Sequence, residues 1–536
     1  MNKPLHDLAR PMLIIRRRPT RRRRGGMVLV LVLIVVAMLS LAGFTFTELM
    51  STERKAAQLL GREAQSRAAM ESGVELLKIR LDPRHVTETH SAETSGQSVW
   101  NDVVVFHDEL RSTTGRFSAI SPWNLSNEGG GVVRSGPTSD CGRLNLNVLL
   151  AWERRDPEVA RRALLALPGM TDEVADSMLD WMDADNESRP FGAEADYYAS
   201  LDPPYEPRNG PIASIDELLL VRGVTPTLLF GTPAGSSLAG DASSGQGRQG
   251  RFSGLDESNS PEGASPFHGW APYLTLYSAE RNVAGDGTPR IDLNDADLRR
   301  LHRRLSKRFS AKQTTFVVLF RQYGPGGSSD SSSADPPETA DFSIPAAHRI
   351  GSVLDLVGAS VAVPKGAATT TINSPFSSDP GRLAEYLPTL LDACTVTPAP
   401  VIRGRVDVME APAEVLSAVP GMSPVKVDAV LSGRARFAEK TGSPPKTLAW
   451  LVTGGAFELG DLKALLPYLT ATGGVYRAEV AGYLDVPSAV VRCEVVVDAT
   501  HSPPEVVLWR SLDPLSRTEA AARFDAPSLV RHGSVD

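Results

Sequence analysis

The residues best suited to chemistry in this sequence are carboxylates gathered in one short segment. Places one, three, five and twelve of a twelve-residue stretch are held by Asp183, Asp185, Glu187 and Glu194. EF-hand loops wrap oxygen ligands around Ca²⁺ at this spacing, with a glycine at place six that permits a sharp turn. Ser188 stands at that place here. On spacing alone, a calcium site and a solvated acidic loop are equally supported.

The stretch LPGMTDEVADSMLDW, residues 167–181, leads into this segment and predicts two helices joined at Pro168-Gly169. Proline stops the first helix, and glycine supplies the positive φ that the turn needs. Helix-hairpin-helix units of this kind often bind DNA, because free backbone amides meet a phosphate. The flanking acids, which are Asp172, Glu173, Asp176 and Asp180, would repel DNA. A hairpin that serves packing is therefore favoured.

Other catalytic or metal-binding patterns are missing from the sequence. It contains no G-x-S-x-G, P-loop or H-E-x-x-H pattern, and its nine histidines stand apart from cysteines and carboxylates at ligand spacing. Cys141, Cys394 and Cys493 are too few and too scattered for a disulfide framework or a thiolate metal site, although one pair could form. We therefore expect no enzymatic activity.

The N-terminal region has the pattern of a membrane anchor. Residues 27–46 carry no charge and span roughly 30 Å as a helix, the thickness of a bilayer core. Residues 1–26 hold nine basic residues and one acid, a net charge of +8 that keeps them in the cytoplasm. Leucines and alanines continue at helical spacing with no proline before Pro83, which predicts one helix over residues 27–80. Without the leader, the net charge of −7 becomes −15, which disfavours nucleic acid as a partner.

The remaining chain predicts an α+β fold in which a small antiparallel sheet packs on the long helix. Strand patterns occur in residues 95–140 and again in residues 472–515, and the later strands either return to the first sheet or form a separate one. Helical patterns fill residues 141–231 and 342–471, a strand and a further unit occupy 267–323, and residues 232–266 and 324–341 are expected to be disordered. RIDLNDADL and RVDVMEAP, starting at Arg290 and Arg405, repeat RLNLNVLL from Arg143. The insertion is thus a helical domain, partly duplicated.

Six sequence blocks in residues 142–231 resemble protein K of the general secretion pathway, a minor pseudopilin of the type II secretion system. They are GRLNLN, LPGM, LDWMDADNESRP, GAEADYY, PPYEPRNGP and SIDELLLVRGVTP. The leader ending in Gly-Gly before an apolar helix is similar to that of type IV pilins and pseudopilins. In that family the prepilin peptidase would cut between Gly26 and Met27. Most pilins have glutamate five residues into the mature chain, whereas this sequence has Leu31, a departure that the protein K family shares.

The resemblance implies a pseudopilin fold with its helical domain inserted, anchored once in the inner membrane with its bulk in the periplasm. It also implies assembly with other minor pseudopilins in a tip complex, contact with the prepilin peptidase and the inner-membrane secretion platform, and no nucleic acid. The helix face for assembly would include Met27, Leu31, Ile34 and Met38. Other interpretations are an ordinary single-pass anchor, a membrane-anchored helix-hairpin-helix DNA-binding protein of an uptake system, and a type IV pilus minor pilin.

The same resemblance favours calcium in the acidic segment, because the family binds calcium in this domain. The ligands it implies are Asp183, Asp185, Glu187, Glu194 and Asp196, with Asp180 and Asp202 behind them. The ion would be structural, since clustered carboxylates repel one another until a cation neutralises them.

Overall fold

The structure is a computed structural model of the 536-residue chain. It describes residues 25–84, 99–109, 113–121, 134–154, 156, 158–231, 268–326, 333–365, 368–441, 445–486 and 490–512. The leader before Gly25 and the expected linker 232–266 lie outside these ranges. The chain divides into two compact units, residues 1–64 and residues 65–536, which we describe separately.

The first unit consists of most of helix α1, which runs without a break from Gly25 to Leu81 and continues into the second unit. Its length matches the prediction for residues 27–80 closely. Every side chain between Val28 and Leu60 is exposed, including a long series of leucines and valines. Of the helices in the described ranges, α1 alone is long and apolar enough to cross a membrane.

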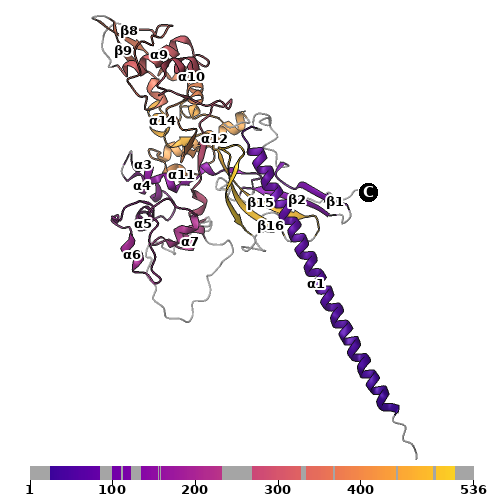
Figure 1. Cartoon of the computed structure of the whole chain (residues 1–536). Helices are drawn as coiled ribbons and strands as arrows, with labels where there is room; N and C mark the ends of the chain where they lie inside the picture. Colours follow the sequence, from indigo (N-terminus) through magenta and orange to yellow (C-terminus); the bar gives the residue numbers. More distant parts are fainter. Residues whose placement is uncertain are drawn as a thin grey trace, which may run out of the picture. The chain divides into compact units, whose positions relative to one another are not determined.

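Residues 65–536 are organised by an antiparallel sheet with the strand order β1-β2-β15-β16-β17, on which β3 pairs with β15. Figure 1 labels β1, β2, β15 and β16 of this sheet. The strands are β1 (Val103–Asp108), β2 (Thr113–Ile120), β3 (Thr138–Ser139), β15 (Val475–Leu484), β16 (Val491–Asp498) and β17 (Glu505–Ser511). Because β15 pairs with β2, the C-terminal strands return to the sheet that the N-terminal strands begin. The alternative of a separate C-terminal sheet is wrong.

The last turns of α1 pack directly on this sheet. Met70, Val74 and Leu77 are buried against Phe117 and Val480 in one apolar cluster. The backbones approach so closely that a Cβ atom on Gly482 would lie 2.1 Å from the carbonyl oxygen of Ser66. Only glycine fits this position of β15, so the contact between helix and sheet depends on it.

Residues 140–474 lie between β3 and β15 and form the insertion, which contains three units in series. Each unit opens and closes with a two-residue strand, and the two strands pair in parallel. The pairs are β4 (Leu144–Asn145) with β5 (Leu274–Thr275), β7 (Ile291–Asp292) with β11 (Cys394–Thr395), and β13 (Val406–Asp407) with β14 (Leu469–Thr470). The three opening strands fall on the three sequence repeats, so the repetition seen in the sequence corresponds to repeated structure.

Helices and 3₁₀ turns fill each unit between its paired strands. The first, after η2 (Asp140–Gly142), holds η3 (Leu146–Val148), α3 (Leu149–Glu153), α4 (Val159–Leu165), α5 (Asp172–Met182), α6 (Ala195–Ala199), η4 (Ile215–Leu220), α7 (Pro226–Phe230) and η6 (Ala271–Tyr273). The second holds α8 (Leu298–Leu305), α9 (Ala311–Tyr323), η7 (Val353–Leu356) and α10 (Pro380–Ala393). The third holds α11 (Ala413–Ala418), α12 (Pro424–Thr441), α13 (Ala449–Thr453) and α14 (Leu459–Leu465). Between units, β6 (Ala279–Arg281) pairs with β12 (Val401–Arg403).

One part of the segment expected to be disordered is ordered. Strand β8 (Ser333–Ala334) pairs in parallel with β10 (Ala368–Asn373), which also pairs with β9 (Ser360–Lys365). The prediction of disorder for 324–341 is therefore wrong for residues 324–326 and 333–341. There the Gly326 N–H donates to the Ser360 carbonyl at 2.7 Å, and the Asp341 carbonyl accepts from Gln322 Nε2 at 2.7 Å. Residues 327–332 of the same segment lie outside the described ranges.

A shared contact explains the second asparagine of the N-L-N repeats. The Asn147 amide nitrogen donates to the carbonyl of Ile212, whose backbone N–H donates back to Asn147 Oδ1, at 3.0 and 2.8 Å. Asn294 makes the same pair of hydrogen bonds to Ile350, at 2.9 and 2.8 Å. Met409 stands at the equivalent place in the third unit and cannot form this clamp, since a thioether lacks a donor.

We expect the substitution Gly482→Ala to lower the free energy of unfolding by about 1–3 kcal/mol, because the new methyl group would overlap the α1 backbone. Urea denaturation of the full chain in detergent would measure the loss. Gly460→Ala in α14 is the matched control, since nothing lies within 4 Å of its Cβ position. Equal stability of the two variants would contradict the close approach of α1 to β15.

Candidate metal centre

The acidic segment connects two helices, α5 and α6, in the first of the three units of the insertion. Helix α5 begins after Thr171, whose hydroxyl accepts from the Val174 backbone N–H, and it ends at Met182. Asp183 caps the C-terminus of α5 with an extended backbone, and Glu194 occupies the N-cap position of α6. The two acids at the ends of the twelve-residue segment are thus fixed by the ends of two helices.

The fold brings three of the predicted carboxylates together. One oxygen atom from each of Asp183, Asp185 and Glu194 lies within 4.8 Å of the others. Glu194 is only 6% exposed, and neither of its oxygens accepts a hydrogen bond from any residue that the structure describes. Asp183 Oδ1 is also buried, with no donor in the same ranges. Buried acceptors without partners are costly, and a cation between them would remove that cost. The triad could therefore hold a metal ion.

The electrostatics of the site follow from this crowding. Burial, and then the charges of Asp180, Asp183 and Asp185, raise the pKa of Glu194 to about 7. Burial also raises the pKa of Asp183, although the Arg189 guanidinium opposes that shift. Below pH 7 the protein without metal thus holds a proton on Glu194, and a bound metal ion would replace that proton.

The other predicted ligands lie outside the triad. Glu187 and Asp196 are exposed, and Asp202 is exposed as well. The Glu187 backbone N–H, rather than its carboxylate, contacts the site by donating to Asp185 Oδ1 at 2.9 Å. Asp180 is fully buried, and Arg189 Nη1 donates to its Oδ1 at 2.9 Å.

Two residues that sequence spacing did not suggest also belong to the site. Asn209 Nδ2 donates to the Asp185 carbonyl at 3.2 Å, and Asn209 Oδ1 is buried without a donor. Arg189 forms ion pairs with both Asp180 and Asp183. Asn209 Oδ1 is a further neutral oxygen that could act as a ligand. The Arg189 guanidinium instead neutralises part of the negative charge of Asp180 and Asp183.

The set of available atoms suits a hard cation. Carboxylate oxygens and one amide oxygen are the ligands that Ca²⁺ and Mg²⁺ prefer, and no imidazole or thiolate is among the triad. The segment differs from an EF-hand, because place five, Glu187, points its backbone rather than its side chain to the cluster. At place six an EF-hand has glycine, whereas this segment has Ser188, whose hydroxyl donates a hydrogen bond to the carbonyl of Arg189 at 3.2 Å.

The hairpin before the site is packed into the protein core. Its turn includes Gly169, with a φ of +68°, as the sequence predicts. Trp270 is fully buried, and its Nε1 donates to the Pro168 carbonyl at 2.8 Å. Arg161 on α4 forms ion pairs with Asp172 and Asp176 of α5. These contacts support the packing interpretation of the hairpin.

The raised pKa of Glu194 predicts a pH dependence for the metal-free protein. A carboxyl group whose pKa is higher in the folded state stabilises the fold at low pH, and this contribution is lost as pH rises through about 7. In EDTA, thermal unfolding should show a loss of up to about 3 kcal/mol between pH 5 and pH 8 from this group. Glu194→Gln should remove that part of the dependence.

The control variant Glu187→Gln should retain the wild-type profile, because this side chain is exposed and outside the triad. Identical profiles for wild type and Glu194→Gln in EDTA would contradict the assignment.

Residues 142–230 match the sequence model of the family described as type II secretion system (T2SS), protein K. Comparison with curated proteins finds no match. Among solved structures, the chain is similar to one in "The Crystal Structure of the GspK-GspI-GspJ complex from enterotoxigenic Escherichia coli Type 2 Secretion System". That similarity covers 86% of this chain and 98% of the other at 11% identity and a TM-score of 0.30, too low to support an argument. Residues 142–230 therefore carry a domain of the type II secretion system protein K family.

Proposed function

We propose that this chain is a minor pseudopilin that caps the periplasmic pseudopilus of the type II secretion system and helps to initiate it. The observation that carries the proposal is the protein K domain at residues 142–230. It occurs in a chain with an apolar helix long enough to cross a membrane. The pseudopilus would drive export of folded proteins across the outer membrane, and the chain would act by assembly, without catalysis.

The exposed part of α1 supports assembly by helix packing. Leu31, Ile34 and Met38 follow one another at three- and four-residue steps, so they share one face, and all three are exposed. In the inner membrane this face would meet lipid, and after extraction it would pack against the helices of other minor pseudopilins. Met27 would be the first residue of that helix after processing, and an apolar Leu31 suits a subunit with none above it.

The insertion supports the position at the tip. Residues 140–474 interrupt a small sheet between β3 and β15, and such a bulk would prevent a further subunit from stacking above. From the protein K domain at residues 142–230, we infer that this chain assembles with other minor pseudopilins in a tip complex. The prepilin peptidase and the inner-membrane secretion platform would be its other contacts, with the chain anchored once in the inner membrane.

The metal centre would serve this assembly by stabilising the first unit of the insertion. We propose that Ca²⁺ binds Asp183, Asp185 and Glu194, with Asn209 Oδ1 as a further ligand. The support for a cation is the set of buried oxygens without donors. The choice of Ca²⁺ over Mg²⁺ rests on the family resemblance.

Processing gives the direct test of the pseudopilin assignment. In cells that contain a prepilin peptidase, we expect the mature chain to begin at Met27, as measured by mass and N-terminal sequencing of protein purified from membranes. Cells without the peptidase should yield the chain with its leader. Gly26→Val should block cleavage, whereas Gly43→Ala, within the apolar stretch, should leave it unchanged. A start beyond Phe46 would indicate secretion with loss of the anchor.

Calcium titration of the full chain in detergent tests the metal proposal. Asp183→Asn and Glu194→Gln should each weaken Ca²⁺ binding at least tenfold in isothermal titration, because each removes a charged ligand. Glu187→Gln and Asp196→Asn should change the affinity less than threefold, because both carboxylates lie outside the triad. The reverse ranking would favour an EF-hand-like ligand set over the one in this structure.

A further inference from the structure

An arginine stands directly before the opening strand of each unit in the insertion, and one of the three has no acidic partner in the part of the chain that the structure describes. Arg143 lies 3.5 Å from Asp140, and Arg405 lies 2.7 Å from Glu280. Arg290, the equivalent residue of the second unit, forms no ion pair with any residue that the structure describes. Its Nε donates to the backbone carbonyl of Asp392 at 3.1 Å, so its terminal amino groups remain available.

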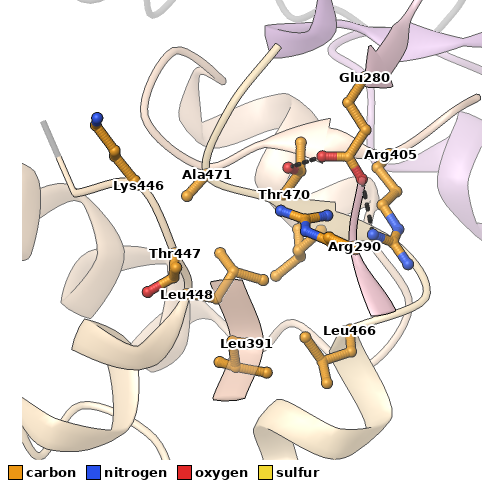
Figure 2. A pocket seen from close by; sticks show the side chains of 11 residues that line it. Glu280, Arg290, Leu391, Arg405, Lys446, Thr447, Leu448, Leu466, Thr470 and Ala471 are labelled. Atoms are coloured by element: carbon orange, nitrogen blue, oxygen red, sulfur yellow. Dashed lines mark hydrogen bonds and ion pairs between the residues drawn. The ribbon is translucent and has the colours of Figure 1, made fainter. Parts of the chain in front are cut away.

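Arg290 lines a cavity of about 50 Å³ between the second and third units (Figure 2). Arg405 and Lys446 line the same cavity, and Lys446 is an exposed side chain that has no acidic partner within the described ranges. Arg405 Nε is buried and donates no hydrogen bond. Three cationic side chains thus surround one small space.

The acidic residue of the cavity is already occupied. Glu280 is 2% exposed; its Oε1 accepts from Arg405 at 2.7 Å, and its Oε2 accepts from the Thr470 hydroxyl (Figure 2). Among the residues that line the cavity, one carboxylate stands against three cations. The Asp392 carboxylate lies outside this lining, near the Lys446 side chain, and accepts from the Gly285 backbone N–H at 2.8 Å. The whole chain has a formal net charge of −7, so this cluster of cations contrasts with the chain as a whole.

The remaining surface of the cavity is apolar. Leucines from α10, from the segment before α13, and from the end of α14 and β14 line it; these are Leu391, Leu448, Leu466 and Leu469. A fully hydrated anion would gain nothing from such a surface, whereas a short alkyl group would be removed from water there. The cavity therefore combines an anion site with an apolar contact.

We propose that this cavity binds a carboxylate carried on one or two apolar carbons. A guanidinium group offers paired N–H donors that match a carboxylate, and Arg290 has such donors free. A volume of about 50 Å³ admits roughly four water-sized groups, which suits a carboxylate with a small alkyl substituent. The ligand is either a small free acid or the C-terminal residue of a peptide with a small side chain.

Ligand-observed NMR on the full chain in detergent tests this site, with propionate and the tripeptide Gly-Gly-Ala as probes. We expect both acids to bind, and propionamide and Gly-Gly-Ala amide to bind at least tenfold more weakly. Tighter binding of the tripeptide than of propionate would identify a peptide C-terminus as the source. Equal or weaker binding of the tripeptide would identify a free acid.

Substitutions locate the binding. Arg290→Gln should weaken propionate binding at least tenfold, and Lys446→Gln, at an exposed position that the fold does not need, should weaken it two- to threefold. Arg303→Gln on α8 is the matched control and should have no effect, because Arg303 is exposed and does not line the cavity. The proposal is overturned if neither acid binds, if the amides bind equally well, or if Lys446→Gln and Arg290→Gln both bind propionate like the wild type.

Discussion

A buried ion cluster joins the insertion to the sheet, and the fold of residues 65–536 depends on this cluster. Arg477 on β15 lies 2.7 Å from Asp140, at the start of the insertion, and 2.7 Å from Glu494 on β16. Asp140 is fully buried and also accepts from the Thr275 hydroxyl of β5. Burial pushes the pKa of Asp140 upward, but Arg477 and Arg143 more than offset this effect and hold it below its usual value. Removing one member would leave an uncompensated buried charge, which typically costs several kcal/mol.

The three parallel strand pairs make similar contacts in each unit of the insertion. Each closing strand ends in a threonine whose hydroxyl accepts a backbone N–H two residues later, at Thr275, Thr395 and Thr470. The Thr275 hydroxyl also donates to Asp140, and the Thr470 hydroxyl donates to Glu280. In the first and third units of the insertion, the last residue of the closing strand therefore contacts a buried carboxylate. The parallel strand pair and the threonine turn after it occur in all three units. These repeated contacts bring the two ends of each unit together, so the insertion ends close to where β15 begins.

The sequence was sufficient to predict those elements whose structure depends on local residue patterns. The uncharged stretch and its helical spacing predicted α1, alternation predicted the strands of the sheet, and the repeats at Arg143, Arg290 and Arg405 marked the three opening strands. Carboxylate spacing included Asp183, Asp185 and Glu194, whose oxygen atoms the fold brings within 4.8 Å of one another, because helix ends fix the first and last of these residues.

The rest of the site depends on contacts between distant segments. Asn209 reaches the metal centre because its backbone N–H donates to the carbonyl of Trp181 at 3.0 Å, a contact that spacing cannot reveal. Glu187 lies outside the triad because the backbone path through the segment differs from that of an EF-hand. Similarly, the missing acidic partner of Arg290 becomes visible only once Asp140 and Glu280 are placed beside the two equivalent arginines.

Arg189 divides the acidic segment into two parts with different roles. Its guanidinium pairs with Asp180 and with Oδ2 of Asp183, and Asp180 also accepts from the Arg189 backbone N–H. Asp180 is therefore neutralised by the protein itself and has no need of a metal. Asp183 Oδ1 and both oxygens of Glu194 are left without donors. The Arg189 guanidinium thus neutralises the more deeply buried Asp180, and the oxygens of Asp183 and Glu194 beside it could hold an external cation.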